Sequence, residues 1–136
     1  MKIGAQLYTV RQYTNDKKEL SETLARIADI GYTCVHANID RNIDVEWLAG
    51  ELNKNGLSCP ITHTEPDMIL ENPDGICRIH SMLGCRYIGI GCAPEALVSA
   101  EAYNSFCSRF LPVANRFKEN GFTFAYHNHG MEFNRF

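Results

Sequence analysis

The sequence predicts an α/β fold in which parallel strands alternate with helices. Four segments have the same order of parts: an apolar helical stripe, then a glycine, then a short β-rich run. The glycines are at positions 31, 56, 84 and 121. Another β-rich run, within residues 1–10, precedes the first segment. No linker, low-complexity tract or charge block interrupts the pattern. Strands joined through helices by short connections make right-handed crossovers and therefore lie parallel.

Each predicted helix has a start signal and a stop signal. In the first, Asp16 and Glu19 match a capping box, and Gly31 ends the apolar stripe that follows. In the last, Pro112 is expected to produce a kink. The predicted helices, each followed by its strand, cover residues 16–31 and 33–38, 44–56 and 57–63, 72–84 and 86–91, and 99–121 with a strand from 122.

Composition limits the class of protein. The 136 residues are 45% hydrophobic, which is enough for one domain with a core. The net charge of -3 gives no sign of nucleic-acid or acidic-membrane binding. No apolar run approaches the roughly 20 residues of a membrane span, and the first ten residues do not resemble a signal peptide. The six cysteines form no CxxC pair, so we expect core thiols of a cytoplasmic protein.

Two architectures fit this order of elements. An open doubly wound sheet with a nucleotide site needs a glycine-rich turn after its first strand, whereas Tyr8-Thr-Val-Arg-Gln12 contains no glycine. Polar side chains stand instead at or near the carboxyl ends of successive strands, which is where a (β/α)8 barrel builds its active site. The sequence therefore favours a barrel. These polar residues are Gln6, His36, Asn38, His63, His127 and His129.

The chain is shorter than a whole barrel. Eight units take roughly 250 residues, and this sequence holds four and a half of them. The first and last strands would then have unpaired edges, which favour pairing with another chain. We expect residues 1–136 to be the N-terminal part of a single barrel domain, in preference to a half-barrel completed by a second copy.

The last strand carries the strongest functional signal. Strand residues two apart share a face, so His127 and His129 are expected to point the same way as Thr123, and Phe124 and Tyr126 the opposite way. Imidazoles transfer protons near neutral pH. Two of them on one face at a strand end predict a pair that lines a site.

Five pieces of the chain, in order, match phrases of one known family. The most specific is Tyr126-His-Asn-His-Gly-Met-Glu-Phe133. The pieces resemble the sugar phosphate isomerase/epimerase family of the xylose isomerase-like TIM-barrel superfamily, over essentially the whole chain. The other four are Ile3-Gly-Ala-Gln-Leu-Tyr-Thr-Val-Arg11, Ala28-Asp-Ile-Gly-Tyr32, Gly56-Leu57 with Thr62-His63, and Leu83-Gly-Cys-Arg-Tyr-Ile-Gly-Ile-Gly91.

The resemblance implies an enzyme that uses a divalent metal (Mn, Mg, Zn or Co) and moves a proton next to the carbonyl of a sugar or sugar phosphate. Glu132 is the one metal ligand that carries over, and the others are expected beyond Phe136. We therefore expect this chain alone to hold the metal weakly or not at all, and to be inactive. His127 and His129 are the expected catalytic residues. The expected substrate contacts are His63, Gln6, Tyr8 and His36, although the family commonly has a glutamate at the last of these positions.

Other functions remain open at this point. A dehydratase of the same fold differs from an isomerase by a second acidic residue, which this chain does not contain. A non-catalytic half-barrel would bind a partner through its open edges. A DNA-repair endonuclease of the superfamily would need a basic face and a histidine at Gly91-Cys92. The expected partner is a small sugar, with a homo-oligomer possible and no nucleic acid or membrane. His80 is expected to be structural, and the glycines at 89 and 91 to allow close backbone approach.

Overall fold

Five parallel strands form one sheet whose spatial order is the order of the sequence. This computed structural model describes residues 3–93, 97 and 99–133. Because each crossover moves one strand onward in the same direction, the sheet grows as a barrel wall does. The strands are β1 (Gly4–Gln6), β2 (Cys34–Ile39), β3 (Ser58–Thr64), β4 (Tyr87–Ile90) and β5 (Thr123–Tyr126).

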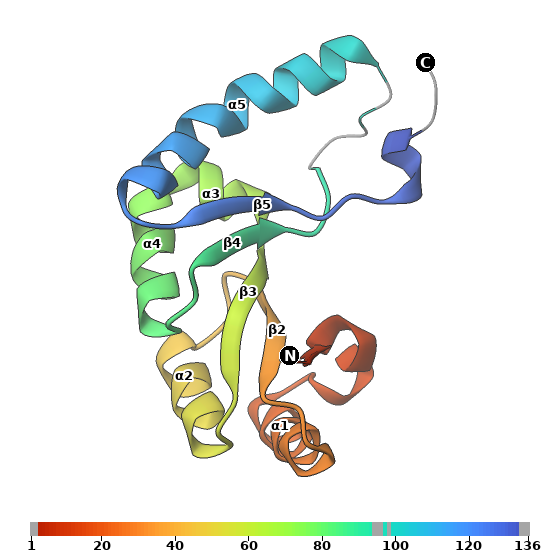
Figure 1. Cartoon of the computed structure of the whole chain (residues 1–136), viewed down its shortest axis with the longest axis vertical. Coiled ribbons are helices and arrows are strands. Elements are labelled where there is room, and N and C mark those ends of the chain that lie inside the picture. Colours follow the sequence, from red (N-terminus) through yellow and green to blue (C-terminus); the bar gives the residue numbers. More distant parts are fainter. Residues whose placement is uncertain (1–2, 94–96, 98, 134–136) are drawn as a thin grey trace.

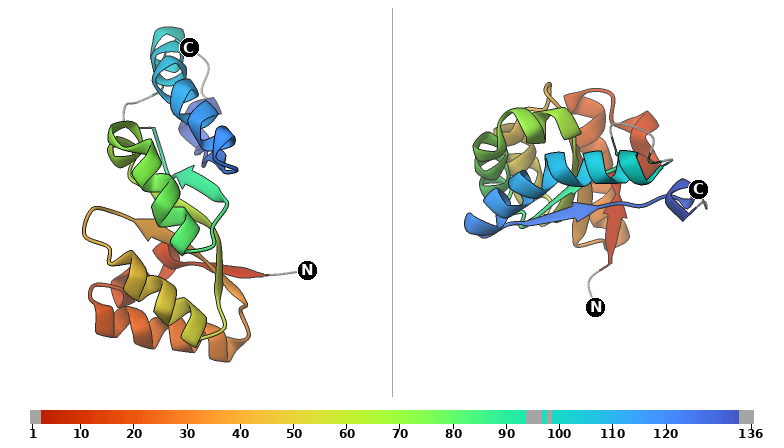
Figure 2. Two further views of the ribbon diagram at one scale, coloured as in Figure 1. Left: turned by 90° about the vertical axis from the view of Figure 1, so that its left-hand side faces the viewer. Right: turned by 90° about the horizontal axis from the view of Figure 1, so that it is seen from above.

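The α-helices follow one another along the outer side of a curled sheet, and the inner side is left open (Figures 1 and 2). A doubly wound sheet would carry helices on both faces. The fold is therefore an incomplete (β/α)8 barrel. The helices are α1 (Lys17–Ile30), α2 (Val45–Lys54), α3 (Pro66–Glu71), α4 (Pro73–Met82) and α5 (Ala100–Glu119), with 3-10 turns η1 (Leu7–Tyr13) and η2 (Gly130–Phe133).

The predicted helix signals are confirmed at both ends of α1. The Asp16 carboxylate accepts a hydrogen bond from the Glu19 N–H at 2.8 Å, and Gly31 ends the helix with a φ of 106°. The returning bond of the capping box is displaced by one residue, because the Glu19 carboxylate accepts from the N–H of Asn15 at 3.1 Å. Helix α5 continues through Pro112. No helix among the described residues has the length and apolar character needed to cross a membrane.

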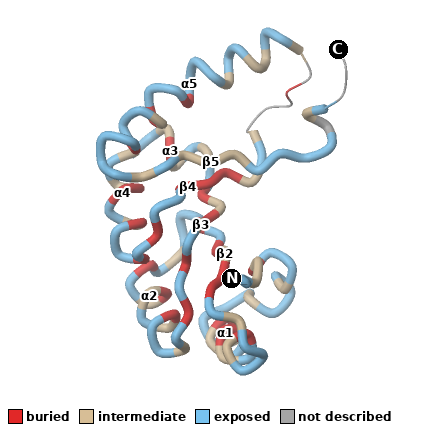
Figure 3. Tube along the Cα trace, viewed as in Figure 1, coloured by how far each residue is buried: buried red, intermediate tan, exposed pale blue. Residues whose placement is uncertain are grey.

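Apolar side chains fill the space between the helices and the sheet, where buried residues recur along β2, β3 and β4 (Figure 3). At the last strand, Phe124 stacks on Phe110 of α5 with ring centroids 5.6 Å apart, and Tyr126 meets Phe106 at 5.5 Å. Phe124 and Tyr126 therefore share the face of β5 that packs against α5, in agreement with the prediction that they point the same way. Four cysteines are buried as expected, whereas Cys92 and Cys107 are exposed; the buried ones are Cys34, Cys59, Cys77 and Cys85.

His80 is part of this core, as predicted. Its side chain is fully buried on α4, with Nε2 2.8 Å from the hydroxyl of Thr62 and Nδ1 2.8 Å from the carbonyl of Ile76. Since both ring nitrogens have partners, the burial of this polar ring is compensated by hydrogen bonds.

Candidate functional site

A cavity of about 540 Å³ opens at the carboxyl ends of β1, β3, β4 and β5. Five of the residues predicted to form the site line it: Gln6, Tyr8, His63, His127 and His129. Because the carboxyl ends of parallel strands lie at one end of a barrel, strand-end residues far apart in the sequence meet there. The other lining residues are Gly91 and Cys92.

Four imidazoles form a continuous row across this end of the sheet. His127 Nδ1 lies 3.2 Å from His63 Nε2, within hydrogen-bonding distance. His36 meets His63 edge to face with ring centroids 4.1 Å apart, and His129 stacks on His127 at 4.9 Å. The prediction that His127 and His129 point the same way is confirmed. We call His36, His63, His127 and His129 the imidazole row.

Two members of the imidazole row are held in their neutral form. Burial, followed by the nearby imidazoles, lowers the pKa of His63 to about 4. Burial also lowers the pKa of His36, with a further contribution from His127. Burial disfavours the charged imidazolium, and no acidic side chain is among the described residues that line the cavity. Near neutral pH these two rings are therefore uncharged and available as proton acceptors or hydrogen-bond partners.

Two glycines, one in β4 and one directly after it, allow close approach to β3. A Cβ on Gly91 would lie 3.0 Å from His63 Nδ1, and one on Gly89 would overlap the carbonyl oxygen of Thr62 on β3. Gly89 is also the residue paired with His63 in the register of β3 and β4. The predicted close approach is confirmed at both positions, and the absence of a Cβ at Gly91 leaves space for the His63 ring.

His36 lies away from the main cavity, on the inner face of the sheet. It lines a smaller cavity of about 220 Å³ together with His63 and His127. Its Nε2 is buried and has no hydrogen-bond partner among the described residues. His36 is therefore in contact with the predicted site through His63, but it lies on the far side of His63 from the main cavity.

Among the predicted site residues, Glu132 lines neither of these two cavities. Its carboxylate accepts hydrogen bonds from Tyr126 Oη at 2.6 Å and from the His129 N–H at 2.7 Å. The bond from Tyr126 contributes most to lowering the pKa of Glu132. The described residues contain no group of three or more His, Cys, Asp or Glu arranged to hold a metal ion. The donor set present in this part of the chain therefore does not fit the divalent metal that the resemblance implies.

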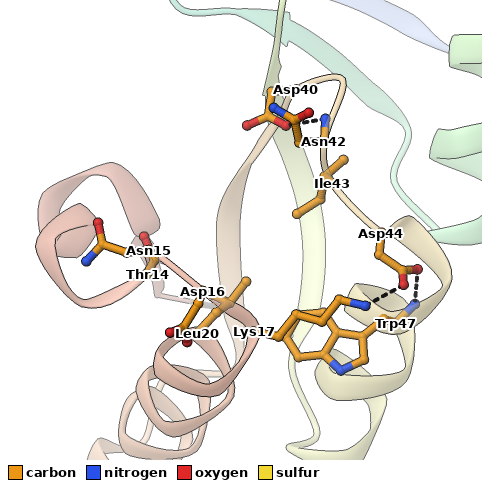
Figure 4. A pocket seen from close by; sticks show the side chains of 10 residues that line it. All are labelled: Thr14, Asn15, Asp16, Lys17, Leu20, Asp40, Asn42, Ile43, Asp44 and Trp47. Atoms are coloured by element: carbon orange, nitrogen blue, oxygen red, sulfur yellow. Dashed lines mark hydrogen bonds and ion pairs between the residues drawn. The ribbon is translucent and has the colours of Figure 1, made fainter.

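A second concavity, of about 230 Å³, lies between the start of α1 and the start of α2 (Figure 4). Its three aspartates are used in local structure. Asp16 caps α1; Asp44 caps α2 and pairs with Lys17 at 2.6 Å; Asp40 accepts the N–H of Asn42 at 2.7 Å. These aspartates are therefore explained by helix capping and by a local turn.

Sequence reasoning missed one residue of the cavity and overvalued another. Cys92 lines the cavity, and its only sequence signal is its place just after β4. Asn38, expected with the rim residues, is exposed and does not line the cavity.

Taken together, the fold and the cavity define a partial (β/α)8 barrel with its polar residues gathered at the carboxyl ends of the strands. Its fold is that of the xylose isomerase-like TIM barrel. A solved AP endonuclease of family 2 from Brucella melitensis superposes with a TM-score of 0.72 at 18% identity, over 93% of this chain and 55% of that one.

Two further solved structures show the same relationship. A probable 3-DHS dehydratase from Bacillus anthracis matches with a TM-score of 0.62 at 9% identity, over 91% of this chain and 51% of that one. A xylose isomerase domain protein from Alicyclobacillus acidocaldarius matches with a TM-score of 0.63 at 15% identity, over 100% of this chain and 54% of that one. The chain spans about half the length of these structures. No model of a protein family and no curated protein matches the sequence. These likenesses show the fold alone, since the similar proteins include an endonuclease, a probable dehydratase and a xylose isomerase domain protein.

Proposed function

We propose that this chain supplies the N-terminal part of a sugar or sugar phosphate isomerase or epimerase that works by proton transfer next to a carbonyl. The observation that carries the proposal is the convergence of His63, His127 and His129 on one cavity at the carboxyl ends of the strands. The sequence resemblance to the sugar phosphate isomerase/epimerase family points to the same reaction.

The lining residues suit that reaction. A proton next to a carbonyl is removed by a base whose pKa lies near or below the working pH, and imidazole meets this condition. His127 and His129 would transfer the proton between the substrate carbon and its new position. His63, Gln6 and Tyr8 would hold the hydroxyl and carbonyl oxygens of the sugar through hydrogen bonds. A cavity of about 540 Å³ is within the range of small-molecule sites.

The divalent metal remains part of this proposal for the complete barrel only. It would stabilise the negative charge that develops on oxygen when the proton leaves. The roles given above to the imidazole, amide and phenol groups of this chain do not depend on it.

Proton exchange with solvent tests the proposal. The full-length gene product, with Mn²⁺ or Mg²⁺ added, is incubated in D₂O with a panel of ketoses and ketose phosphates, and proton NMR follows the signal next to the carbonyl. His127→Gln and His129→Gln are expected to slow the exchange by about 10²–10⁴-fold. The control Glu119→Gln, on the exposed surface of α5, should retain it. No exchange with any sugar of the panel would refute the proposal.

A dehydratase is the second candidate, because its reaction begins with the same removal of a proton and one of the similar solved structures is that of a probable dehydratase. In the same reaction mixtures, loss of water from the substrate would create a conjugated carbonyl that absorbs ultraviolet light. Absorbance that rises in step with proton exchange would favour the dehydratase, and exchange without it the isomerase.

A non-catalytic half-barrel is the third candidate, and the edges of the sheet are the observation that favours it. β1 and β5 are the outer strands of the sheet, and Ile3 beside β1 is exposed. Light scattering after size-exclusion chromatography would show a stable dimer of this 15.4 kDa chain if two copies pair. A monodisperse monomer would argue against this candidate.

A further inference from the structure

We propose that Glu132 is a positioning residue that fastens the turn carrying His129, and that it is not a ligand of a catalytic metal. We call the two hydrogen bonds that its carboxylate accepts, from Tyr126 Oη and from the His129 N–H, the clamp. All the groups of the clamp belong to this chain. Only its consequence for catalysis rests on the proposed function, through the role given there to His129.

Both oxygens of the carboxylate are already used. Oε1 accepts the hydrogen bond of Tyr126 Oη at 2.6 Å, and Oε2 accepts the N–H of His129 at 2.7 Å. The side chain is only 9% exposed. Hydrogen bonds to an ionised carboxylate are short and roughly twice as strong as neutral ones. A metal at Glu132 would have to displace two such bonds and enter a nearly closed position.

The groups that hold Glu132 are themselves anchored on the outer side of β5. The Tyr126 ring packs against Phe106 of α5, on the strand face opposite to the cavity. The hydroxyl of Tyr103, also on α5, donates to the backbone carbonyl of Glu132 at 2.9 Å. The 3-10 turn η2 is therefore attached to both β5 and α5. Glu132 lines neither of the cavities that contain the imidazole row.

The clamp acts on one imidazole more than on the other. The backbone N–H of His127 continues the sheet and donates to the carbonyl of Ile90 at 3.0 Å. The N–H of His129 lies beyond the strand and is bonded to Glu132. His129 is exposed, and its ring stacks on that of His127 at 4.9 Å. Its Nδ1 lies 4.0 Å from Glu132 Oε1, so Glu132 contacts both the backbone and the ring of His129. Loss of the clamp should free His129 and spare His127.

Hydrogen exchange of the labelled 136-residue chain, read by NMR, tests the clamp. Glu132→Gln leaves one oxygen for two donors, and Tyr126→Phe removes the phenol while keeping the ring. Both variants are expected to speed exchange of the His129 amide by about tenfold and to leave the His127 amide unchanged. The matched control Glu119→Gln, whose carboxylate pairs with Arg116 on the surface, should change neither. Unchanged exchange at His129 in both variants would overturn the proposal.

A titration with Mn²⁺, which broadens NMR signals near its binding site, separates the clamp from a metal ligand. If Glu132 binds metal, the ion broadens the signals of residues 130–133 in the wild-type chain; Glu132→Gln abolishes this, and Tyr126→Phe strengthens it by freeing the carboxylate. That result would overturn the clamp. Broadening that is absent from η2, or the same in Glu132→Gln and the wild type, supports it. Neither measurement uses a sugar, so a failure of the proposed enzymatic function would leave both results interpretable.

Discussion

Replacing Gly89 by alanine should destabilise the protein, whereas the same replacement at Gly50 should stabilise it. Gly89 is buried in β4, and an added Cβ would overlap the carbonyl oxygen of Thr62 on the neighbouring strand. That oxygen belongs to the backbone of β3, so it cannot move aside as a flexible side chain can. Overpacking costs about 1–3 kcal/mol, and a backbone clash belongs at the upper end. The reduced entropy of the unfolded chain offsets up to about 1 kcal/mol. The expected net loss is about 2 kcal/mol.

Gly50 provides the opposite case within the same molecule. It is exposed in the interior of α2, and an added Cβ would meet nothing within 4 Å. Alanine in a helix interior is favoured over glycine by about 1 kcal/mol. In urea unfolding with an m-value of about 2 kcal/mol/M, the midpoint should fall by about 1 M for Gly89→Ala and rise by about 0.5 M for Gly50→Ala. A Gly89→Ala midpoint at or above that of the wild type would refute the close approach of β3 and β4.

Three further outcomes follow from burial and charge. His80→Leu removes one of two partners of the buried Thr62 hydroxyl, which keeps Thr64 at 3.0 Å, and also the partner of the Ile76 carbonyl. It should cost about 1–3 kcal/mol in thermal unfolding; a loss below about 0.5 kcal/mol would contradict the buried network. Because burial lowers the pKa values of His63 and His36, the unfolded chain binds more protons than the folded one between about pH 6.5 and 4. The free energy of unfolding should therefore fall as the pH falls through this range, and it should fall less in His63→Gln. An identical pH profile in that variant would contradict the assignment of the effect to His63. Arg116→Ala breaks only exposed ion pairs and should change the free energy of unfolding by less than about 1 kcal/mol; a larger effect would mean that the exposed pairs act as a network.

Most of the fold was predictable because its helices are long and have clear ends. Helices α1, α2, α4 and α5 were predicted from an apolar stripe, a capping residue and a terminal glycine. Strands β2, β3 and β4 were placed to within about a residue, whereas β1 and β5 are shorter than predicted, β5 ending at Tyr126 before the histidines. Helix α3 was missed, because its six residues are too few to show a periodic stripe. The turn η1 was missed for a similar reason: a short 3-10 segment has no distinctive apolar period.

The site was predictable only as far as strand periodicity extends. The rule that strand residues two apart share a face placed Phe124, Tyr126 and His127 correctly, because each is on β5 or directly after it. Glu132 lies six residues beyond the strand, after a turn, where periodicity gives no direction. The two hydrogen bonds that fix its carboxylate come from the outer-face tyrosine and from a backbone N–H, and neither partner can be read from the spacing of His129 and Glu132.

The histidine at position 36, where the resembling family commonly has a glutamate, has a physical consequence for the imidazole row. Its ring meets that of His63 at 4.1 Å, so the charge at position 36 acts directly on the proton affinity of His63. A neutral imidazole leaves His63 uncharged, as a proton acceptor. A carboxylate there would favour the imidazolium and turn His63 into a donor.

Substituting His36 by glutamate tests this reasoning. An opposite charge within about 4–6 Å raises the pKa of an imidazole by about 1–3 pH units, so the pKa of His63 should rise from about 4 to 5 or more. NMR titration of the His63 ring protons measures the change. His36→Gln is the control, because it removes the neighbouring imidazole without adding charge and should raise the pKa only slightly. If the His63 pKa is the same in His36→Glu and His36→Gln, burial alone sets the protonation of the imidazole row, and the identity of residue 36 does not control it.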